Sequence, residues 1–98
     1  MNDASAFRLV LEHALNHSLA HLENLERSPV AASASLQMLR DRLVKPLNSE
    51  GMRAEQVIDE LVDDTAGGIM GSAGGRFFGW VIGGSLPAAL AADWLTSA

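Results

Sequence analysis

Residues 67–84 read GGIMGSAGGRFFGWVIGG and hold eight of the nine glycines in this 98-residue chain. Every fourth residue from Gly67 to Gly83 is glycine, a spacing typical of packed transmembrane helices. However, the apolar run from Phe77 to Ala92 is shorter than the roughly 20 residues that span a bilayer, and Arg76 precedes it. Each glycine also weakens a helix in water by about 1 kcal/mol. We therefore expect loop and strand here, with glycine allowing positive φ or close approach.

The composition is that of one small, acidic, globular domain. Hydrophobic residues make up 48% of the chain and the formal net charge is −5, which argues against disorder and disfavours nucleic acid, whose phosphates bind basic surfaces. The absence of cysteine excludes disulfides and thiolate metal sites. No apolar run follows Met1, so we predict no secretory signal and expect a cytoplasmic protein without a membrane span.

Charged residues are concentrated in the first two thirds of the chain. Eleven of the twelve acidic residues lie at or before Asp64, and only Arg76 and Asp93 are charged from Thr65 onward. Because an ordinary surface helix carries charge on its outer face, residues 77–98 are expected to be covered by other protein. The sequence ends within a helical pattern without a capping residue, which predicts a truncated chain or one that a partner completes.

Apolar residues at intervals of three and four predict four helices. Their expected ranges are Asp3 or Ser5 to Glu26, Leu36 to Val44, Arg53 to Asp64, and Pro87 to Trp94. Ser33 or Ser35 is expected to cap the second helix and Ser85 the fourth. The segment Phe77–Ile82 is a candidate short strand or extended segment.

The third helix is predicted to be amphipathic. Its inward side would carry Val57, Ile58, Leu61 and Val62. Its solvated side would carry Glu55, Asp59, Glu60 and Asp63. Gly67 or Gly68 is expected to end the helix with a left-handed cap.

Three histidines, His13, His17 and His21, follow one another at intervals of four on the first helix. Such a pair can hold zinc or nickel on one face. The triplet sweeps about 80° around the helix axis, so all three do not converge easily. We expect a polar flank beside the apolar stripe and no metal site.

Motifs for covalent or nucleotide chemistry are missing. No two glycines are two positions apart, the six residues 79–84 lack a phosphate-loop lysine, and no serine lies in a nucleophile elbow. Lys45, the only lysine, lies beside an acidic helix, whereas a Schiff-base lysine needs a desolvated pocket. We expect Lys45 to be a solvated surface charge. Spacing alone thus predicts a mainly helical module with no assignable chemistry.

Four blocks of sequence resemble a known enzyme pattern. They are VIDEL at 57–61, two glycines at 67–68 with Gly71, GRFFGWVIGG at 75–84, and PAALAADWL at 87–95. Together they resemble the N-terminal part of the pyridoxal-phosphate-dependent decarboxylases of the aromatic-amino-acid and glutamate decarboxylase group. The resemblance covers residue 46 to the end and, more loosely, the first helix. Complete members of that family are several times longer than this chain.

The resemblance implies a mainly α fold, namely the N-terminal helical segment of a fold-type I pyridoxal-phosphate enzyme, with about four helices and a short extended glycine-rich stretch. Residues 1–66 would form a helical dimerisation segment, and residues 67–98 the glycine-rich substrate-side segment with the start of the next helix. It further implies a homodimer, pyridoxal 5′-phosphate as cofactor, and an amino acid as the small-molecule substrate, which loses carbon dioxide.

Site residues also follow from the resemblance. Trp80 matches the aromatic residue of the substrate pocket. Val81, Ile82 and Gly83 match the loop that approaches the substrate. Ile82 and Gly83 differ from the proline and threonine of some relatives, and Ala73 stands where a histidine often precedes the phenylalanine pair, so the substrate is not identified. The family's cofactor-binding lysine, histidine and aspartate have no counterpart here, which implies a chain that is inactive alone.

An interpretation from a different class stays open. The chain would be a small helical interaction module, or a membrane-associated one, that buries residues 77–95 through its glycine-rich packing segment. Solubility that depends on detergent would favour this interpretation over the enzyme.

Overall fold

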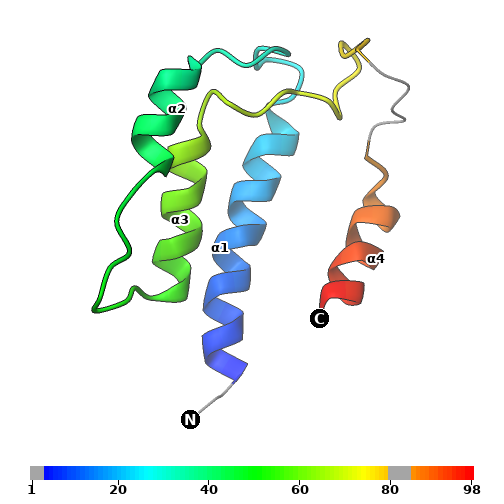
Figure 1. Ribbon diagram of the computed structural model, residues 1–98. Coiled ribbons are helices and arrows are strands. Elements are labelled where there is room, and N and C mark those ends of the chain that lie inside the picture. Colours follow the sequence, from blue (N-terminus) through cyan, green and yellow to red (C-terminus); the bar gives the residue numbers. More distant parts are fainter. Residues whose placement is uncertain (1–3, 80–84) are drawn as a thin grey trace.

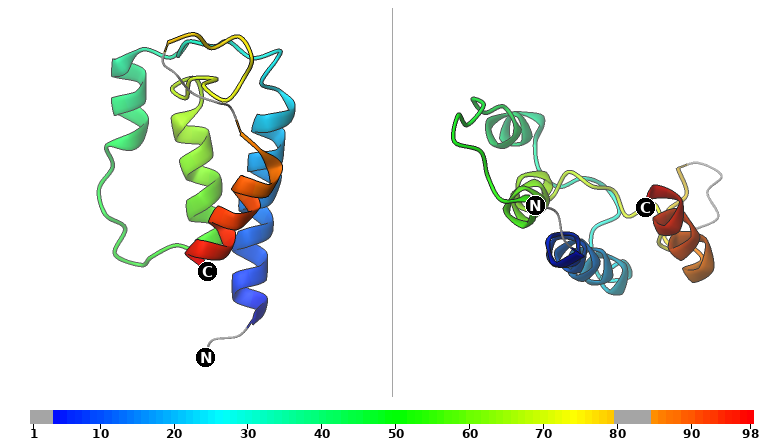
Figure 2. Two further views of the ribbon diagram at one scale, coloured as in Figure 1. Left: turned by 90° about the vertical axis from the view of Figure 1, so that its right-hand side faces the viewer. Right: turned by 90° about the horizontal axis from the view of Figure 1, so that it is seen from below.

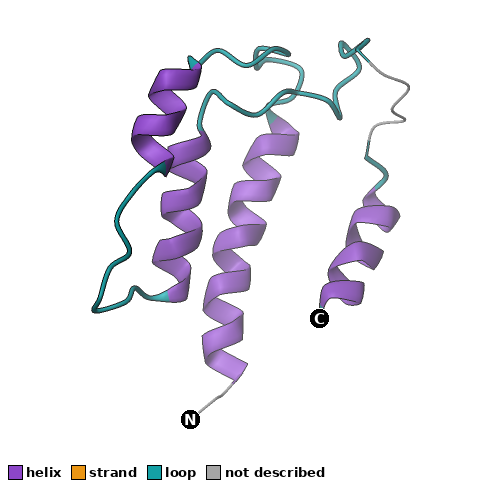
Figure 3. Cartoon of the chain, in the orientation of Figure 1, coloured by secondary structure: helices purple, strands orange, loops and turns teal. Residues whose placement is uncertain are grey.

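Four helices make up the regular structure of the described part of the chain (Figure 1). The computed structural model describes residues 4–79 and 85–98. The helices are α1 (Ala4–Glu23), α2 (Leu36–Leu43), α3 (Ala54–Thr65) and α4 (Pro87–Ser97). Within the described ranges there is no strand (Figure 3), which confirms a mainly α protein. The prediction of a strand is wrong for Phe77–Gly79, which are loop, and residues 80–82 lie outside the described residues.

Three of the helices form a row. α3 lies between α1 and α2 and contacts both; α1 and α3 run in the same direction and α2 runs in the opposite one (Figure 1). Seen from below, α4 stands apart from this row (Figure 2). No Cα atom of α4 comes within 8 Å of a Cα atom of another described helix. The Cα radius of gyration is 15.7 Å, against about 13 Å for a compact domain of this length, so the chain is open.

Local signals set the starts of the helices. Ser35 caps α2, since its side chain accepts a hydrogen bond from the Met38 amide at 3.1 Å, which confirms one of the two predicted caps. The prediction that Ser85 caps α4 is wrong, because the helix begins one residue later than that cap requires. Leu86 is the N-cap residue, and Pro87 takes the first helical position, where a missing N–H costs nothing.

Two glycines and an arginine stabilise the C-terminal end of α3. Gly67 has φ +80°, and the Gly68 amide donates to the Thr65 carbonyl at 2.8 Å, which confirms the predicted left-handed cap. Arg42 Nη1 on α2 donates to the Ala66 carbonyl at 2.7 Å. A cation at this end also offsets the negative pole of the helix. α2 and α3 are thereby joined at one end.

A buried core is missing from the described part of the chain, where Gly71 alone is buried. The predicted inward side of α3 is covered only in part: Ile58 is half-buried, but Val57 is 48% and Leu61 50% exposed. The prediction is wrong for these two residues because a single row of helices leaves its two broad faces open. On the described residues, no helix has the length and hydropathy required to cross a bilayer.

Candidate functional site

The glycine-rich segment leaves α3 and crosses the end of α1 (Figure 1). The Gly67 carbonyl accepts hydrogen bonds from the Ser33 and Ala34 amides at 2.7 and 2.9 Å, and the Gly71 amide donates to the Val30 carbonyl at 2.9 Å. A Cβ atom on Gly67 would lie 3.0 Å from the Ala34 Cβ. Glycine here permits two backbones to approach closely, as the sequence predicted.

Arg76 attaches the far part of this segment to α1. Its Nη2 donates to the Leu25 carbonyl at 2.7 Å and to the Ser28 carbonyl at 2.5 Å. Of the next two residues, Phe77 is half-buried, whereas Phe78 is 89% exposed. Phe78 is therefore presented at the surface near the turn that follows α1.

The four residues predicted to line the substrate pocket, Trp80, Val81, Ile82 and Gly83, lie outside the described residues. Their described neighbours, Gly79 and Ser85, are exposed. Ser85 and Ala73, which lie on either side of that stretch, line both cavities described next.

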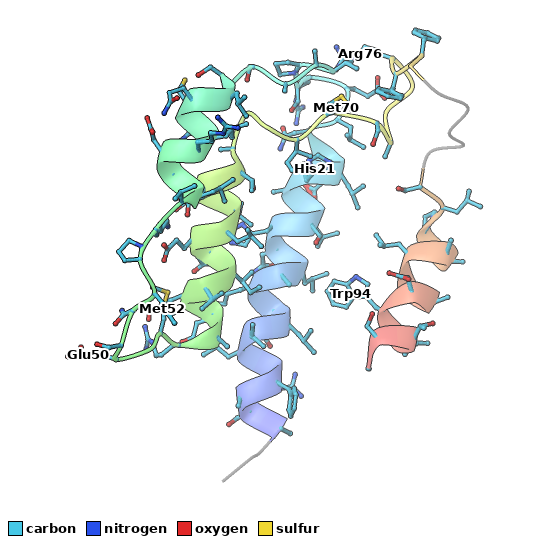
Figure 4. All side chains as sticks on the ribbon, in the orientation of Figure 1. His21, Glu50, Met52, Met70, Arg76 and Trp94 are labelled. Carbon is cyan, nitrogen blue, oxygen red and sulfur yellow. The ribbon has the colours of Figure 1, made fainter. Side chains whose placement is uncertain are left out.

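A cavity of about 800 Å³ lies between α1 and α4. Trp94 points from α4 toward α1 (Figure 4). The lining is almost wholly apolar and includes Leu15, Leu19 and Leu22 of α1 and Leu90, Trp94 and Leu95 of α4. No charged residue lines it among the described ones. This cavity suits an apolar group or an apolar side of another polypeptide.

A second cavity, of about 690 Å³, lies between α1, α3 and the glycine-rich segment. Its lining is mixed, with His17 and His21 from α1, Thr65 from α3, and Gly71 among its walls. Figure 4 shows His21 near the upper end of α1, below the loop that carries Met70. The two cavities share Ser18 and Leu22 of α1 and Leu25 of the turn after it, so this end of α1 lies between them.

Two histidines of α1 join Asp59 of α3. His13 Nδ1 lies 2.9 Å and His17 Nε2 2.7 Å from Asp59 Oδ1. The hydrogen bond from His13, which has the larger effect, and that from His17 lower the pKa of the Asp59 carboxyl. His13, His17 and Asp59 stay partly exposed, as predicted for a polar flank and a solvated acid, and the packing of α3 on the histidine side of α1 joins them. His21 is not part of this cluster.

The cluster is a hydrogen-bonded link. Within the part of the chain that the structure describes, no group of three or more His, Cys, Asp or Glu side chains is arranged to hold a metal ion. The i, i+4 spacing of His13 and His17 was the available signal in the sequence. It could not reveal the acceptor, since Asp59 is 42 residues away from His17.

Lys45 lies between two carboxylates of α3, Glu60 and Asp64. Hydrogen bonds to Asp64, which has the larger effect, and to Glu60 raise the pKa of Lys45 and stabilise its charged form. Lys45 is exposed, which confirms the predicted surface charge, and the loop after α2 places it beside these two acids. A charged, paired lysine does not fit the attachment of pyridoxal phosphate, which requires a neutral amine.

Comparison with protein-family models, with curated proteins and with solved structures gives no match.

Proposed function

We propose that this chain is the N-terminal segment of a pyridoxal-phosphate-dependent amino-acid decarboxylase of fold-type I, which is inactive alone. It would contribute dimer contacts and line the substrate pocket of a cytoplasmic homodimer. The observation that carries the proposal is the exposure of its apolar surface: only Gly71 is buried among the described residues. A chain of this composition needs further protein to cover it.

The position of the uncovered surface supports this proposal. The apolar walls of the cavity between α1 and α4 include Leu19, Leu90 and Trp94, and Leu95 is 79% exposed. α4 and the phenylalanine pair belong to the blocks of sequence that resemble the decarboxylases. The open surface and the resemblance thus fall on the same residues, which is expected when the remainder of an enzyme and its second subunit cover them.

The chemistry would come from outside this chain. Pyridoxal phosphate, when bound, accepts the electron pair that remains when the substrate carboxylate leaves as carbon dioxide. Lys45 does not fit as its attachment point, so we place the attachment lysine in the polypeptide that follows. The contribution of this chain would be Trp80, with Val81, Ile82 and Gly83, as a wall that holds the amino acid and excludes water.

Expression of the protein together with the coding sequence that follows Ala98 tests the proposal. The extended protein is expected to show a cofactor absorption band that borohydride reduction abolishes, and to release carbon dioxide from at least one of the common amino acids or their hydroxylated aromatic derivatives. The 98-residue chain is the control and should do neither. A stop codon directly after Ala98, or an extended protein that does not bind pyridoxal phosphate, would sink the proposal.

The apolar cavity also favours a second candidate, a helical interaction or membrane-associated module. Its lining offers no charge among the described residues and thus suits an apolar partner or a lipid surface. Flotation with phosphatidylcholine vesicles separates the two functions. A chain that floats with vesicles, while the extended protein binds no cofactor, would replace the enzyme proposal with this one.

A further inference from the structure

We infer that Arg76 is a positioning residue, which fixes the glycine-rich segment on the turn that follows α1 and thereby sets the place of the phenylalanine pair. The anchoring itself does not depend on any activity. Its consequence for catalysis rests on the proposed function.

The anchor joins parts of the chain that are far apart in sequence. Arg76 Nη2 donates to the carbonyls of Leu25 and Ser28, which are 51 and 48 residues earlier. Both carbonyls belong to the turn that follows α1, in which the Ser28 amide donates to the Asn24 carbonyl at 2.8 Å. Figure 4 shows Arg76 in the loops above α1. Hydrogen bonds from a charged donor are stronger than neutral ones, so two of them hold this crossing firmly.

Neighbouring glycines let the two segments lie against each other. A Cβ atom on Gly74 would lie 3.7 Å from the Leu25 Cβ, and the Gly75 amide donates to Glu26 Oε1 at 3.4 Å. The Phe77 amide then donates to the Gly74 carbonyl at 3.3 Å. The turn that precedes the phenylalanine pair is thus built on the residues that Arg76 fixes.

The carbonyl contacts matter more than the nearby ion pair. Arg76 Nε lies 3.9 Å from Glu26 Oε2, and the two side chains are 45% and 71% exposed. A long, solvated ion pair contributes little. Binding both carbonyls requires a donor group that reaches the two of them. The planar guanidinium of arginine does so, and the shorter lysine would do so only in part.

The segment lacks regular structure. Between Thr65 and Pro87, the ends of α3 and α4, the described residues contain no helix or strand, so no ladder of regular hydrogen bonds holds the chain there. Gly71 is bonded to Val30, and among the described residues that follow it Arg76 and the amide of Gly75 hydrogen-bond to the turn after α1. Removing the arginine should therefore release the turn and the phenylalanine pair together.

Amide hydrogen exchange in the 98-residue chain tests the anchor without requiring activity. Arg76→Met keeps the aliphatic stem and removes the donors, and should speed exchange in peptides covering residues 71–79 about tenfold, the effect of losing one strong hydrogen bond. Arg76→Lys should restore part of the protection. Arg27→Met is the matched control, because Arg27 bonds only to Asn24 within its own turn, and it should leave residues 71–79 unchanged.

The results separate the two claims. Unchanged exchange in Arg76→Met, or an equal effect of Glu26→Gln, would overturn the anchor whatever the protein does. In the extended protein, Arg76→Met is expected to raise KM for the amino acid that is decarboxylated about tenfold, with cofactor content unchanged and Arg76→Lys intermediate. Faster exchange without a change in KM would overturn the catalytic consequence, and faster exchange in a protein that binds no cofactor would leave the anchor standing while the proposed function fails.

Discussion

His17 Nε2 on α1 lies 2.7 Å from Asp59 Oδ1 on α3, although 42 positions separate the two residues along the chain. His13 donates to the same carboxylate from one turn earlier. The two rings therefore bind Asp59 from successive turns of α1, and this fixes the rotation of α1 relative to α3. In a chain without a described buried core, polar links of this kind carry much of the orientation of the helices.

Acid should weaken the contact between α1 and α3. The folded state lowers the pKa of Asp59 from its ordinary value of 3.8. A lowered folded pKa gives stability that is present above the unfolded value and is lost as the pH falls through the folded value. Unfolding followed by circular dichroism from about pH 6 to pH 2 should show this loss, and Asp59→Asn should reduce its size.

Asp63→Asn is the matched control for that experiment, since Asp63 lies on the same helix and is exposed. The Asp63→Asn variant should keep the loss of stability in acid that Asp59 causes. An equal effect of the two substitutions would show that general charge, rather than the bonds from His13 and His17, sets the response to acid.

Alkali should weaken the contact between Lys45 and α3. The pKa of Lys45 is raised above its ordinary value of 10.5 by Asp64 and Glu60. A raised folded pKa gives stability that is complete below the unfolded value and is lost as the pH rises through the folded value. The melting temperature should therefore fall more steeply above about pH 10 in the natural protein than in Lys45→Met.

At neutral pH, Lys45→Met should also lower the melting temperature, because Glu60 and Asp64 then repel each other one turn apart on α3. Lys45→Arg keeps the positive charge and is expected to preserve most of the stability. A methionine variant as stable as the natural protein at neutral pH would contradict the assigned pairing.

Gly67→Ala should destabilise the protein more than Gly51→Ala. Both glycines have positive φ, +80° and +79°, so each alanine incurs the left-handed strain of about 1–2 kcal/mol. Only at Gly67 would the new Cβ also meet a neighbour, at 3.0 Å from the Ala34 Cβ, whereas nothing lies within 4 Å at Gly51. Urea unfolding measures both free energies, and equal losses would exclude close packing of the two loops.

The sequence predicted what is local in this fold. The Ser35 cap, the glycine at Gly67 and the approximate bounds of the helices depend on residues within one or two turns of one another, and these predictions are confirmed. The periodicity of apolar residues predicted a first helix that is too long, since α1 ends at Glu23 rather than near Glu26. There the Asn24 side chain bonds to the Ala20 carbonyl and the chain continues as turns.

Relations between distant segments could not be predicted. Asp59 has the spacing of a solvated residue, and only the packing of α3 on α1 turns it toward His13 and His17. Arg76 likewise marked the edge of an apolar run, with no indication that Leu25 would accept its hydrogen bond. Val57, on the predicted inward side of α3, is 48% exposed, because a single row of helices leaves that side open.

Uncovered apolar residues should make the isolated chain associate with itself. Leu95 lines the cavity between α1 and α4 and is 79% exposed, and clustered apolar residues of this kind mark contact surfaces. Sedimentation velocity at rising concentration should reveal oligomers, which Leu95→Asp should reduce. Leu47→Asp is the control, because Leu47 is 98% exposed in the loop before α3 and lines neither cavity. A stable monomer at high concentration would contradict the prediction.

Trp80→Ala should distinguish a substrate wall from a cofactor site in the extended protein. If Trp80 holds the amino acid, its loss removes an apolar pocket contact, and kcat/KM should fall about tenfold or more while pyridoxal phosphate content stays normal. Arg76→Met should act in the same direction, because it releases the phenylalanine pair that precedes Trp80 without deleting the Trp80 side chain. Loss of cofactor with unchanged KM would show that Trp80 is wrongly placed in the substrate pocket, and a variant with full activity would remove the residue from the site altogether.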